Sequence, residues 1–391
     1  MRIETPQISW HGSESDKGRN APLLSCSIIE SGLEDIKGPK YSQVLATAGN
    51  DSVINLWKLS IKAEDPQLSL SKNRVHVVED SSAKRGNALS SSSSSFVKIT
   101  HLASLRRHER SVNATKFSPD GLTLATAGDG GSVVLWAIPF DKRGGSNGRH
   151  FWSEIKKESD IECRVLPSSG SDAGGATSCE DIFDLQWSPC STRFVVCSLD
   201  HCMLVFEYSI TEGVASTPVT SGWKCVARIR DHTHYVQGVA YDPLGVYLCS
   251  QGSDRSVRVY SHPQKEKKKG KTELSREATI KFWPEPTTPS PKKTSTESPR
   301  KAPAARRDHL FADEATVESF FRRLAWTPDG AFLITPAGIL PKADKDGSLT
   351  EEAPTAFGTY LFARHCFERP VAVLPGLTKV NHPACVEIFI F

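Results

Sequence analysis

Histidine, serine or threonine, aspartate and an aromatic residue recur together in this chain at matched spacings. Three stretches carry most of them: Thr47, Asp51 and Trp57; His108, Thr126 and Trp136; and His232, Ser250, Asp254 and Tyr260. Side chains of these types can join in a chain of hydrogen bonds, because hydroxyls accept from indole and imidazole N–H groups. The same types also serve as catalytic groups. Their role therefore depends on the elements that position them.

These residues fall on a repeated unit of short alternating runs. One run recurs as LATAGNDSVINLW (45–57), LATAGDGGSVVLW (124–136), FVVCSLDHCMLVF (194–206) and LCSQGSDRSVRVY (248–260). An earlier run recurs as ATKFSPDG (114–121), DLQWSPCS (184–191), GVAYDPLG (238–245) and RLAWTPDG (323–330). Period-two alternation between Gly, Pro and Asp turns predicts short antiparallel strands. A recurring four-strand unit that closes on a Trp-type residue is typical of a WD40 β-propeller blade, so we predict an all-β fold.

A structural role is favoured over catalysis for the recurring His and Asp residues, because they follow the repeat period. A buried network of this kind fixes packing only when each polar group is paired. His11 is a candidate fourth member of the first set. The second set has Gly130 where an Asp is expected, and the repeat at 194–206 keeps Asp200 alone, so we expect packing to replace the network in these repeats.

We interpret residues 1–391 as a single WD40 propeller domain for which seven blades are expected. We count roughly 22 strands, whereas seven blades need about 28. Residues 2–9 are predicted to close the ring by completing the last blade, and residues 384–391 to open a sixth blade. On this interpretation the C-terminal blades are incomplete because the chain is truncated.

Four polar stretches are predicted to be disordered inserts, at about 59–95, 139–160, 167–178 and 263–315. Ser and Gly tracts cannot bury enough apolar surface to order themselves, and the last stretch contains six prolines between 284 and 303. Strands are expected to resume at 96–102, 161–166 and 223–229. Residues 312–324 are expected to form a short helix or turn that leads into a fifth blade.

The positive charge of the chain is concentrated in the last of these inserts. Residues 264–307 hold thirteen Lys and Arg against five Glu, which is +8 in a chain of net charge +3, and the remainder is acidic. Lys267, Lys268, Lys269 and Lys271 form a cluster of nuclear-import type. A solvated charge run explains them equally well. Ser290 and Ser298 each begin a Ser-Pro-x-Lys motif, which predicts phosphorylation by proline-directed kinases.

No enzyme motif is found in the sequence. Gly270-Lys271-Thr272 lacks the earlier glycine of a phosphate-binding loop, and neither His-Glu-x-x-His nor Gly-x-Ser-x-Gly occurs. The ten cysteines include no Cys-x-x-Cys pair and are interpreted as reduced, so no metal or cofactor is expected. No apolar run is long enough to span a membrane. A non-catalytic binding scaffold is predicted, with His234 and Tyr235 as candidate partner-binding residues on a loop rim.

Two longer stretches resemble one family specifically. HYVQGVAYDPLGVYLCSQGSDRSVRVYS and ESFFRRLAWTPDGAFLITPAG, with the opening ISWH and the closing ERPVAVLP, resemble the WD-repeat middle subunit of chromatin assembly factor 1. Hir-type histone regulators are similar relatives. The resemblance implies a nuclear, non-enzymatic histone chaperone subunit. Its implied partners are the large and small subunits of that complex, the core histones of the central tetramer, and the anti-silencing histone chaperone, whose usual docking motif this chain lacks. DNA is an indirect partner.

Three alternatives remain open at this stage. A Hir-type chaperone would act independently of replication. A generic WD40 adaptor, such as a ubiquitin-ligase substrate receptor, would not need the FFRRL stretch. DNA binding through the basic insert predicts salt-sensitive affinity that is lost when residues 264–307 are deleted.

Overall fold

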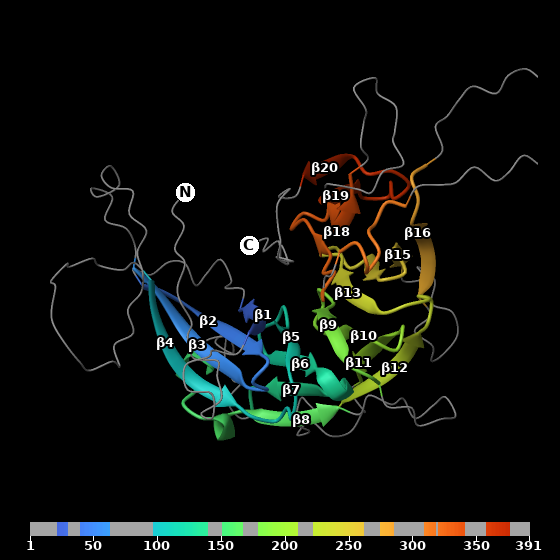
Figure 1. Ribbon diagram of the computed structural model, residues 1–391. Helices are drawn as coiled ribbons and strands as arrows, with labels where there is room; N and C mark the ends of the chain where they lie inside the picture. The colour runs from blue at the N-terminus through green and yellow to red at the C-terminus, as the bar shows by residue number, and fades with distance from the viewer. Residues whose placement is uncertain are drawn as a thin grey trace, which may run out of the picture. The chain divides into compact units, whose positions relative to one another are not determined.

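The computed structural model of the chain describes ten ranges: residues 22–29, 40–62, 97–139, 151–166, 179–209, 222–261, 274–284, 309–317, 320–340 and 357–375. Within them the chain is built almost entirely of strands. These strands form five four-stranded sheets, and in each sheet consecutive strands are neighbours (Figure 1). The all-β prediction is confirmed.

The chain divides into two compact units, and the first comprises Met1–Val196 with Leu204–Arg228. Its strands are β1 (Leu23–Ile28), β2 (Lys40–Gly49), β3 (Ile54–Lys62), β4 (Val97–Leu105), β5 (Val112–Phe117), β6 (Thr123–Gly128), β7 (Val133–Ala137), β8 (Glu162–Leu166), β9 (Ile182–Trp187), most of β10 (Arg193–Ser198), most of β11 (Met203–Tyr208) and most of β12 (Trp223–Ile229).

The second unit, Cys197–Met203 with Ile229–Phe391, contains the last two sheets. Their strands are β13 (Val236–Tyr241), β14 (Tyr247–Gly252), β15 (Ser256–Ser261) and β16 (Ser275–Ile280), then β17 (Ala325–Trp326), β18 (Phe332–Ile339), β19 (Phe357–Ala363) and β20 (Ala372–Pro375). The boundaries of the five sheets along the chain lie close to the boundaries of the repeats found in the sequence.

Three strands of the second and fourth sheets are buried along their whole length. All six residues of β6, β13 and β14 are buried, because both faces of these strands are covered. The fourth strand of a sheet lies at its edge and is more exposed, as the β16 residues show. In the second and fourth sheets burial therefore falls from the first strand to the fourth.

The predicted fourth strands at 96–102, 161–166 and 223–229 are confirmed as β4, β8 and β12. The disorder predicted for the whole of 263–315 is wrong, because β16 lies inside that range and pairs with β15 from Val257↔Ile280 to Ser261↔Ser275. Residues 274–280 contain no proline, and the free edge of β15 offers them backbone partners. Pro263 precedes this segment, and the next proline in the stretch is Pro284.

The 139–160 and 59–95 inserts also begin or end inside ordered structure. Residues 152–160 carry two short 3₁₀ helices, η4 (Trp152–Glu154) and η5 (Glu158–Asp160), and β3 continues to Lys62. The insert predicted at 167–178 lies outside the described residues, as do the strands predicted at 2–9 and 384–391. Residues 314–316 form a turn, which is one of the two structures predicted for residues 312–324. Seven blades stay a prediction. In the described ranges no helix is long and apolar enough to cross a membrane.

Trp152 explains why residues 152–160 are ordered. Its side chain is fully buried, and the indole N–H donates to the carbonyl of Gly121 at 2.7 Å. The ring meets Phe117 edge to face, with 5.2 Å between centroids. Apolar burial of an aromatic ring of this size outweighs the entropy of ordering a short polar segment.

Replacing Trp152 with Ala is expected to lower the free energy of unfolding by about 3–5 kcal/mol, since a buried ring is lost and a cavity remains. Urea unfolding followed by tryptophan fluorescence and circular dichroism measures it. Lys156→Ala, an exposed change in the same segment, is the control and should stay within about 0.5 kcal/mol of the parent. Equal effects of the two variants would contradict an anchoring role for Trp152.

Candidate functional site

The second sheet contains a complete hydrogen-bonded set in its buried part. His108 Nε2 lies 2.8 Å from Thr126 Oγ1, and the Trp136 indole N–H donates to the same hydroxyl oxygen at 3.0 Å. The other imidazole nitrogen, Nδ1, lies 2.9 Å from Ser132 Oγ. Ser132 therefore occupies the role for which the sequence offered Gly130. The signal was available, because Ser132 follows Thr126 by the same six residues that separate Ser250 from Ser256.

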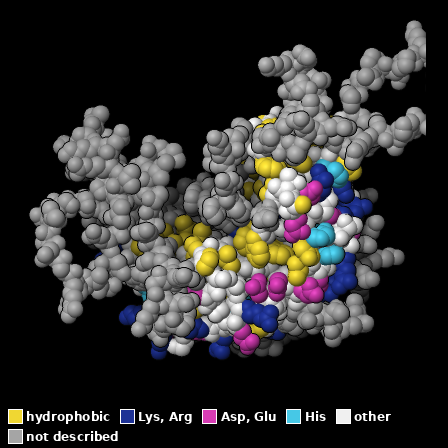
Figure 2. Space-filling model, viewed as in Figure 1, with side chains coloured by type: hydrophobic (Ala, Val, Ile, Leu, Met, Phe, Trp, Pro, Cys, Tyr) yellow, Lys and Arg dark blue, Asp and Glu magenta, His cyan; other side chains and the backbone are white. Residues whose placement is uncertain are grey.

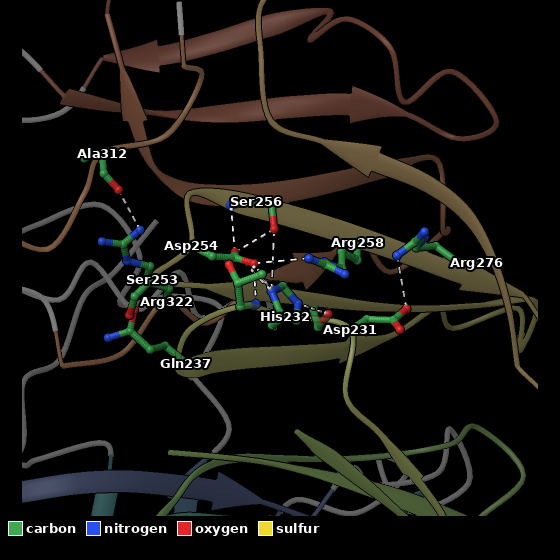
Figure 3. A network of polar contacts seen from close by, with 12 residues as sticks. Asp231, His232, Gln237, Ser253, Asp254, Ser256, Arg258, Arg276, Ala312 and Arg322 are labelled. Atoms are coloured by element: carbon green, nitrogen blue, oxygen red, sulfur yellow. Dashed lines mark hydrogen bonds and ion pairs between the residues drawn. The ribbon is translucent and has the colours of Figure 1, made fainter. Parts of the chain in front are cut away.

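The fourth sheet uses a carboxylate where the second uses a hydroxyl (Figure 3). His232 Nε2 lies 2.8 Å from Ser250 Oγ, and Nδ1 lies 3.1 Å from the Asp254 carboxylate. Asp254 also accepts from Ser256 Oγ at 2.6 Å and from Arg258 at 3.2 Å. Tyr260 is 1% exposed at the position of the expected tryptophan.

The charge state of this network follows from burial and hydrogen bonding. Burial lowers the pKa of His232, and the hydrogen bond and charge of Asp254 offset only part of the effect. Burial alone would raise the pKa of Asp254, but hydrogen bonds from His232, Ser256 and the Thr233 backbone N–H hold it well below its ordinary value. A neutral imidazole therefore donates Nδ1–H to an ionised carboxylate and accepts the Ser250 hydroxyl at Nε2.

The first sheet has part of the network and the third replaces it with rings. The Trp57 indole N–H donates to Thr47 Oγ1 at 2.7 Å, and the Val53 backbone N–H donates to Asp51 at 3.4 Å. His11 lies outside the described residues. In the third sheet Asp200 accepts from Cys202 Sγ at 2.9 Å. Phe206 stacks on Phe194 there, with 4.8 Å between ring centroids and 8° between planes.

Each of these groups holds a turn to its own sheet. The His and Asp side chains engage hydroxyls, backbone N–H groups and an arginine, and their donors and acceptors are used in fixing the loops that join strands. Residues so engaged are poor candidates for acid–base catalysis. The arrangement is a rigid support for exposed loops.

His234 and Tyr235, the candidate partner-binding residues, belong to a cluster of three rings. Their centroids are 4.1 Å apart, and His201 stacks on His234 at 5.7 Å with 13° between planes. All three side chains are partly buried, and no described residue bonds to the buried Nδ1 of His234. The cluster adds His201 to the pair chosen from the sequence. Figure 2 shows histidine, acidic and basic side chains beside hydrophobic ones on one face of the second unit.

The remaining candidates, Lys267, Lys268, Lys269, Lys271, Ser290 and Ser298, lie outside the described residues. Their roles in import and phosphorylation stay predictions.

The Asp-Pro-Leu-Gly turn between β13 and β14 contains an ion pair, between Asp242 and Arg364, that was not predicted from the sequence. The Asp242 carboxylate is fully buried, and Arg364 engages both of its oxygens, at 2.8 and 2.6 Å. It also accepts the backbone N–H groups of Leu244 and Val246 at 3.0 Å each. Burial would raise the pKa of Asp242, but Arg364 and these N–H groups hold it below its ordinary value. Arg364 thus joins the fifth sheet to the fourth.

Replacing Arg364 with Met is expected to lower the free energy of unfolding by about 3–5 kcal/mol, because the Asp242 charge stays buried without its partner. Arg193→Met is the matched control. Its pair with Glu207 spans 2.7 Å, but both side chains are 29% exposed, so about 1 kcal/mol or less is expected. Urea unfolding of both variants measures the difference. A loss of about 1 kcal/mol or less in Arg364→Met would show that Asp242 finds another partner.

His108 predicts a loss of stability in mild acid. Burial lowers its pKa from 6.5 to about 4. The unfolded chain therefore takes up a proton between these values that the folded chain refuses, and stability falls as the pH drops from 6.5 towards 4. The contribution is on the order of 3 kcal/mol.

The free energy of unfolding of His108→Gln, measured between pH 7 and pH 4.5, should fall less steeply than that of the parent. His232 and the carboxylates are common to both proteins and cancel in the comparison. Parallel profiles would mean that His108 takes up its proton in the folded state.

The sequence of this chain is similar to those of chromatin assembly factor 1 subunits and of a HIR1 protein. A chromatin assembly factor 1 subunit FAS2 homolog from Oryza sativa is 29% identical over 97% of this chain and 56% of its own length. The B subunit of chromatin assembly factor 1 from Mus musculus is 26% identical over 96% of this chain and 49% of its own length. Protein HIR1 from Kluyveromyces lactis is 26% identical over 75% of this chain and 25% of its own length. The chain thus spans about half the length of the first two relatives.

The match to a family model agrees with the sheets and their turn networks. The model of the CAF1B/HIR1 β-propeller domain matches residues 87–388, which is more than half of the chain. The β-propeller prediction is confirmed by this match and by the five four-stranded sheets. The chain therefore belongs to the CAF1B/HIR1 β-propeller domain family.

Proposed function

We propose that this chain is the propeller part of a non-catalytic subunit of a chromatin assembly factor, which carries core histones of the central tetramer to DNA during replication and repair. The observation that carries the proposal is the extent of the matches. Similarity to the chromatin assembly factor subunits runs over 96–97% of the chain, against 60–83% for three HIR1 proteins.

The physical features of the chain suit a scaffold. Its His, Ser and Asp groups hold turns in place, so that the exposed loops are presented in a fixed geometry. Preorganised loops lower the entropy cost of binding a partner. Apart from the basic stretch at 264–307 the chain is acidic, and an acidic body favours encounter with basic proteins such as histones.

The proposed partners are the large and small subunits of the complex, core histones and the anti-silencing histone chaperone. DNA is reached indirectly, through the histones. We place the protein in the nucleus, with Lys267, Lys268, Lys269 and Lys271 as the import signal. The ring cluster of His201, His234 and Tyr235 is the proposed partner-binding rim, because aromatic residues on fixed loops are frequent anchors at interfaces.

HIR1-type action is the second candidate, supported by the HIR1 relative and by the family that both share. It differs in the partners that the chain would hold, so a binding experiment separates the two.

Affinity purification of the tagged 391-residue chain from nuclear extract, read by mass spectrometry, tests the proposal. We expect the two other assembly factor subunits and core histones. A double variant, His234→Ala with Tyr235→Ala, is expected to lower recovery of at least one partner severalfold, because aromatic anchors dominate interface energy. Lys156→Ala, far along the sequence and exposed, serves as control.

Other outcomes point elsewhere. Recovery of Hir-type partners would move the chain to the replication-independent group. Recovery of ubiquitin-ligase or vesicle-coat proteins, without histones, would overturn the chaperone assignment. Full recovery by the double variant would exclude the ring cluster as the rim.

A further inference from the structure

Arg322 is a buried guanidinium for which the described residues supply no carboxylate. Its side chain is 1% exposed, and Nη1 donates to the carbonyl of Ala312 at 2.7 Å. Its Nε and Nη2 atoms have no hydrogen-bond partner, and no ion pair joins it to a carboxylate in the described part of the chain. Figure 3 shows the guanidinium directed towards Ala312 and beside the His232–Asp254 network.

In the part of the chain that the structure describes, the carboxylates that follow Ala312 are engaged elsewhere or exposed. Asp313 lies 3.5 Å from Arg255 and accepts the Thr316 backbone N–H at 2.8 Å. Glu314 is exposed on the following turn. Burial lowers the pKa of Arg322, and the charges of Glu314 and Asp313 raise it only in part. The charge on Arg322 is therefore incompletely balanced.

The backbone around Arg322 is locked in place. Its N–H donates to the Gln237 carbonyl at 3.1 Å, and the Gln237 side chain donates to the Phe320 carbonyl at 3.2 Å. A Cβ on Gly238 would lie 2.0 Å from the Arg322 carbonyl oxygen, so only glycine allows this close approach. Arg322 is thus held where it is, although two of its donors are unsatisfied.

An unpaired guanidinium of this kind is costly, because each unsatisfied buried donor forfeits its hydration. The planar fork of arginine matches a carboxylate, which accepts two parallel N–H bonds. Phe320, two residues earlier, is 53% exposed and packs edge to face on Phe321 at 4.7 Å. Arginine and aromatic residues are both enriched at protein interfaces.

We propose that Arg322 anchors a binding site for the carboxylate of an acidic peptide segment in a partner protein, with Phe320 as its apolar neighbour. The guanidinium is covered, so the incoming carboxylate reaches Nε and Nη2 when side chains of the exposed 314–316 turn shift. Changes of this size are common on binding. The inference stands on the geometry of Arg322 and does not require the chaperone function.

Fluorescence anisotropy with a labelled hexaglutamate peptide, titrated with the 391-residue chain at near-physiological salt, tests the site. Arg322→Gln should weaken binding about tenfold or more, since charge-assisted bidentate contacts are lost. Glu314→Gln should tighten it severalfold, because a competing carboxylate is removed. Arg323→Gln is the matched control, as its guanidinium lies over the Phe321 ring at 3.9 Å, and it should change little.

Two further measurements make the result decisive. Urea unfolding identifies any loss of fold in Arg322→Gln, and the exposed Glu314→Gln tests the site without disturbing the core. The basic stretch at 264–307 binds any polyanion. Equal affinities of the parent, Arg322→Gln and Glu314→Gln would therefore assign the peptide to that stretch and overturn the proposal. Binding of inorganic phosphate at Arg322 without hexaglutamate binding would overturn the peptide assignment in favour of a free oxyanion.

Discussion

The fourth sheet depends on two buried carboxylates, one at each end of β14. Asp242 precedes the strand and Asp254 follows it. Each accepts backbone N–H groups of its own turn, and each is balanced by a guanidinium, from Arg364 and Arg258 respectively. A buried charge is tolerated only when it is paired and hydrogen-bonded. The two turns therefore have little freedom, and the exposed loops that continue from them inherit this rigidity.

The other sheets reach the same end by different chemistry. In the second sheet Ser132 takes the place of the carboxylate, so the network of His108 is neutral and needs no counter-charge. In the third sheet stacked rings of Phe194 and Phe206 fill the space. A neutral or apolar solution avoids the desolvation cost of an ion. What is common to the repeats is therefore the fixed turn, and the residue types vary.

This variation explains how far the sequence could predict the molecule. The strands and turns were predictable, because period-two alternation and Gly, Pro and Asp turns are local signals. Ser132 and the Asp242–Arg364 pair were missed, since each depends on residues brought together by folding, over 24 positions in one case and 122 in the other. β16 was missed because its order comes from the free edge of β15 and its own composition is polar.

Inserts show the same limit. Trp152 orders a polar segment by reaching the carbonyl of Gly121 and the ring of Phe117, and neither contact has a signal within the segment. The available clue was Trp152 itself, a large aromatic residue in a mainly polar stretch. Composition averaged over the whole stretch concealed it.

Three arginines of the second unit, Arg258, Arg322 and Arg364, are buried or partly buried, and they differ in their partners. Arg364 and Arg258 each meet a carboxylate of their own chain, at 2.6 and 3.2 Å, and so complete the turns at either end of β14. Arg322 is buried more deeply than Arg258, yet among the described residues its side chain donates only to one carbonyl oxygen. Packing alone would be served by an uncharged side chain at lower cost. The guanidinium at that position, on a backbone fixed by Gln237 and Gly238, is consistent with the proposed acceptor from a partner protein.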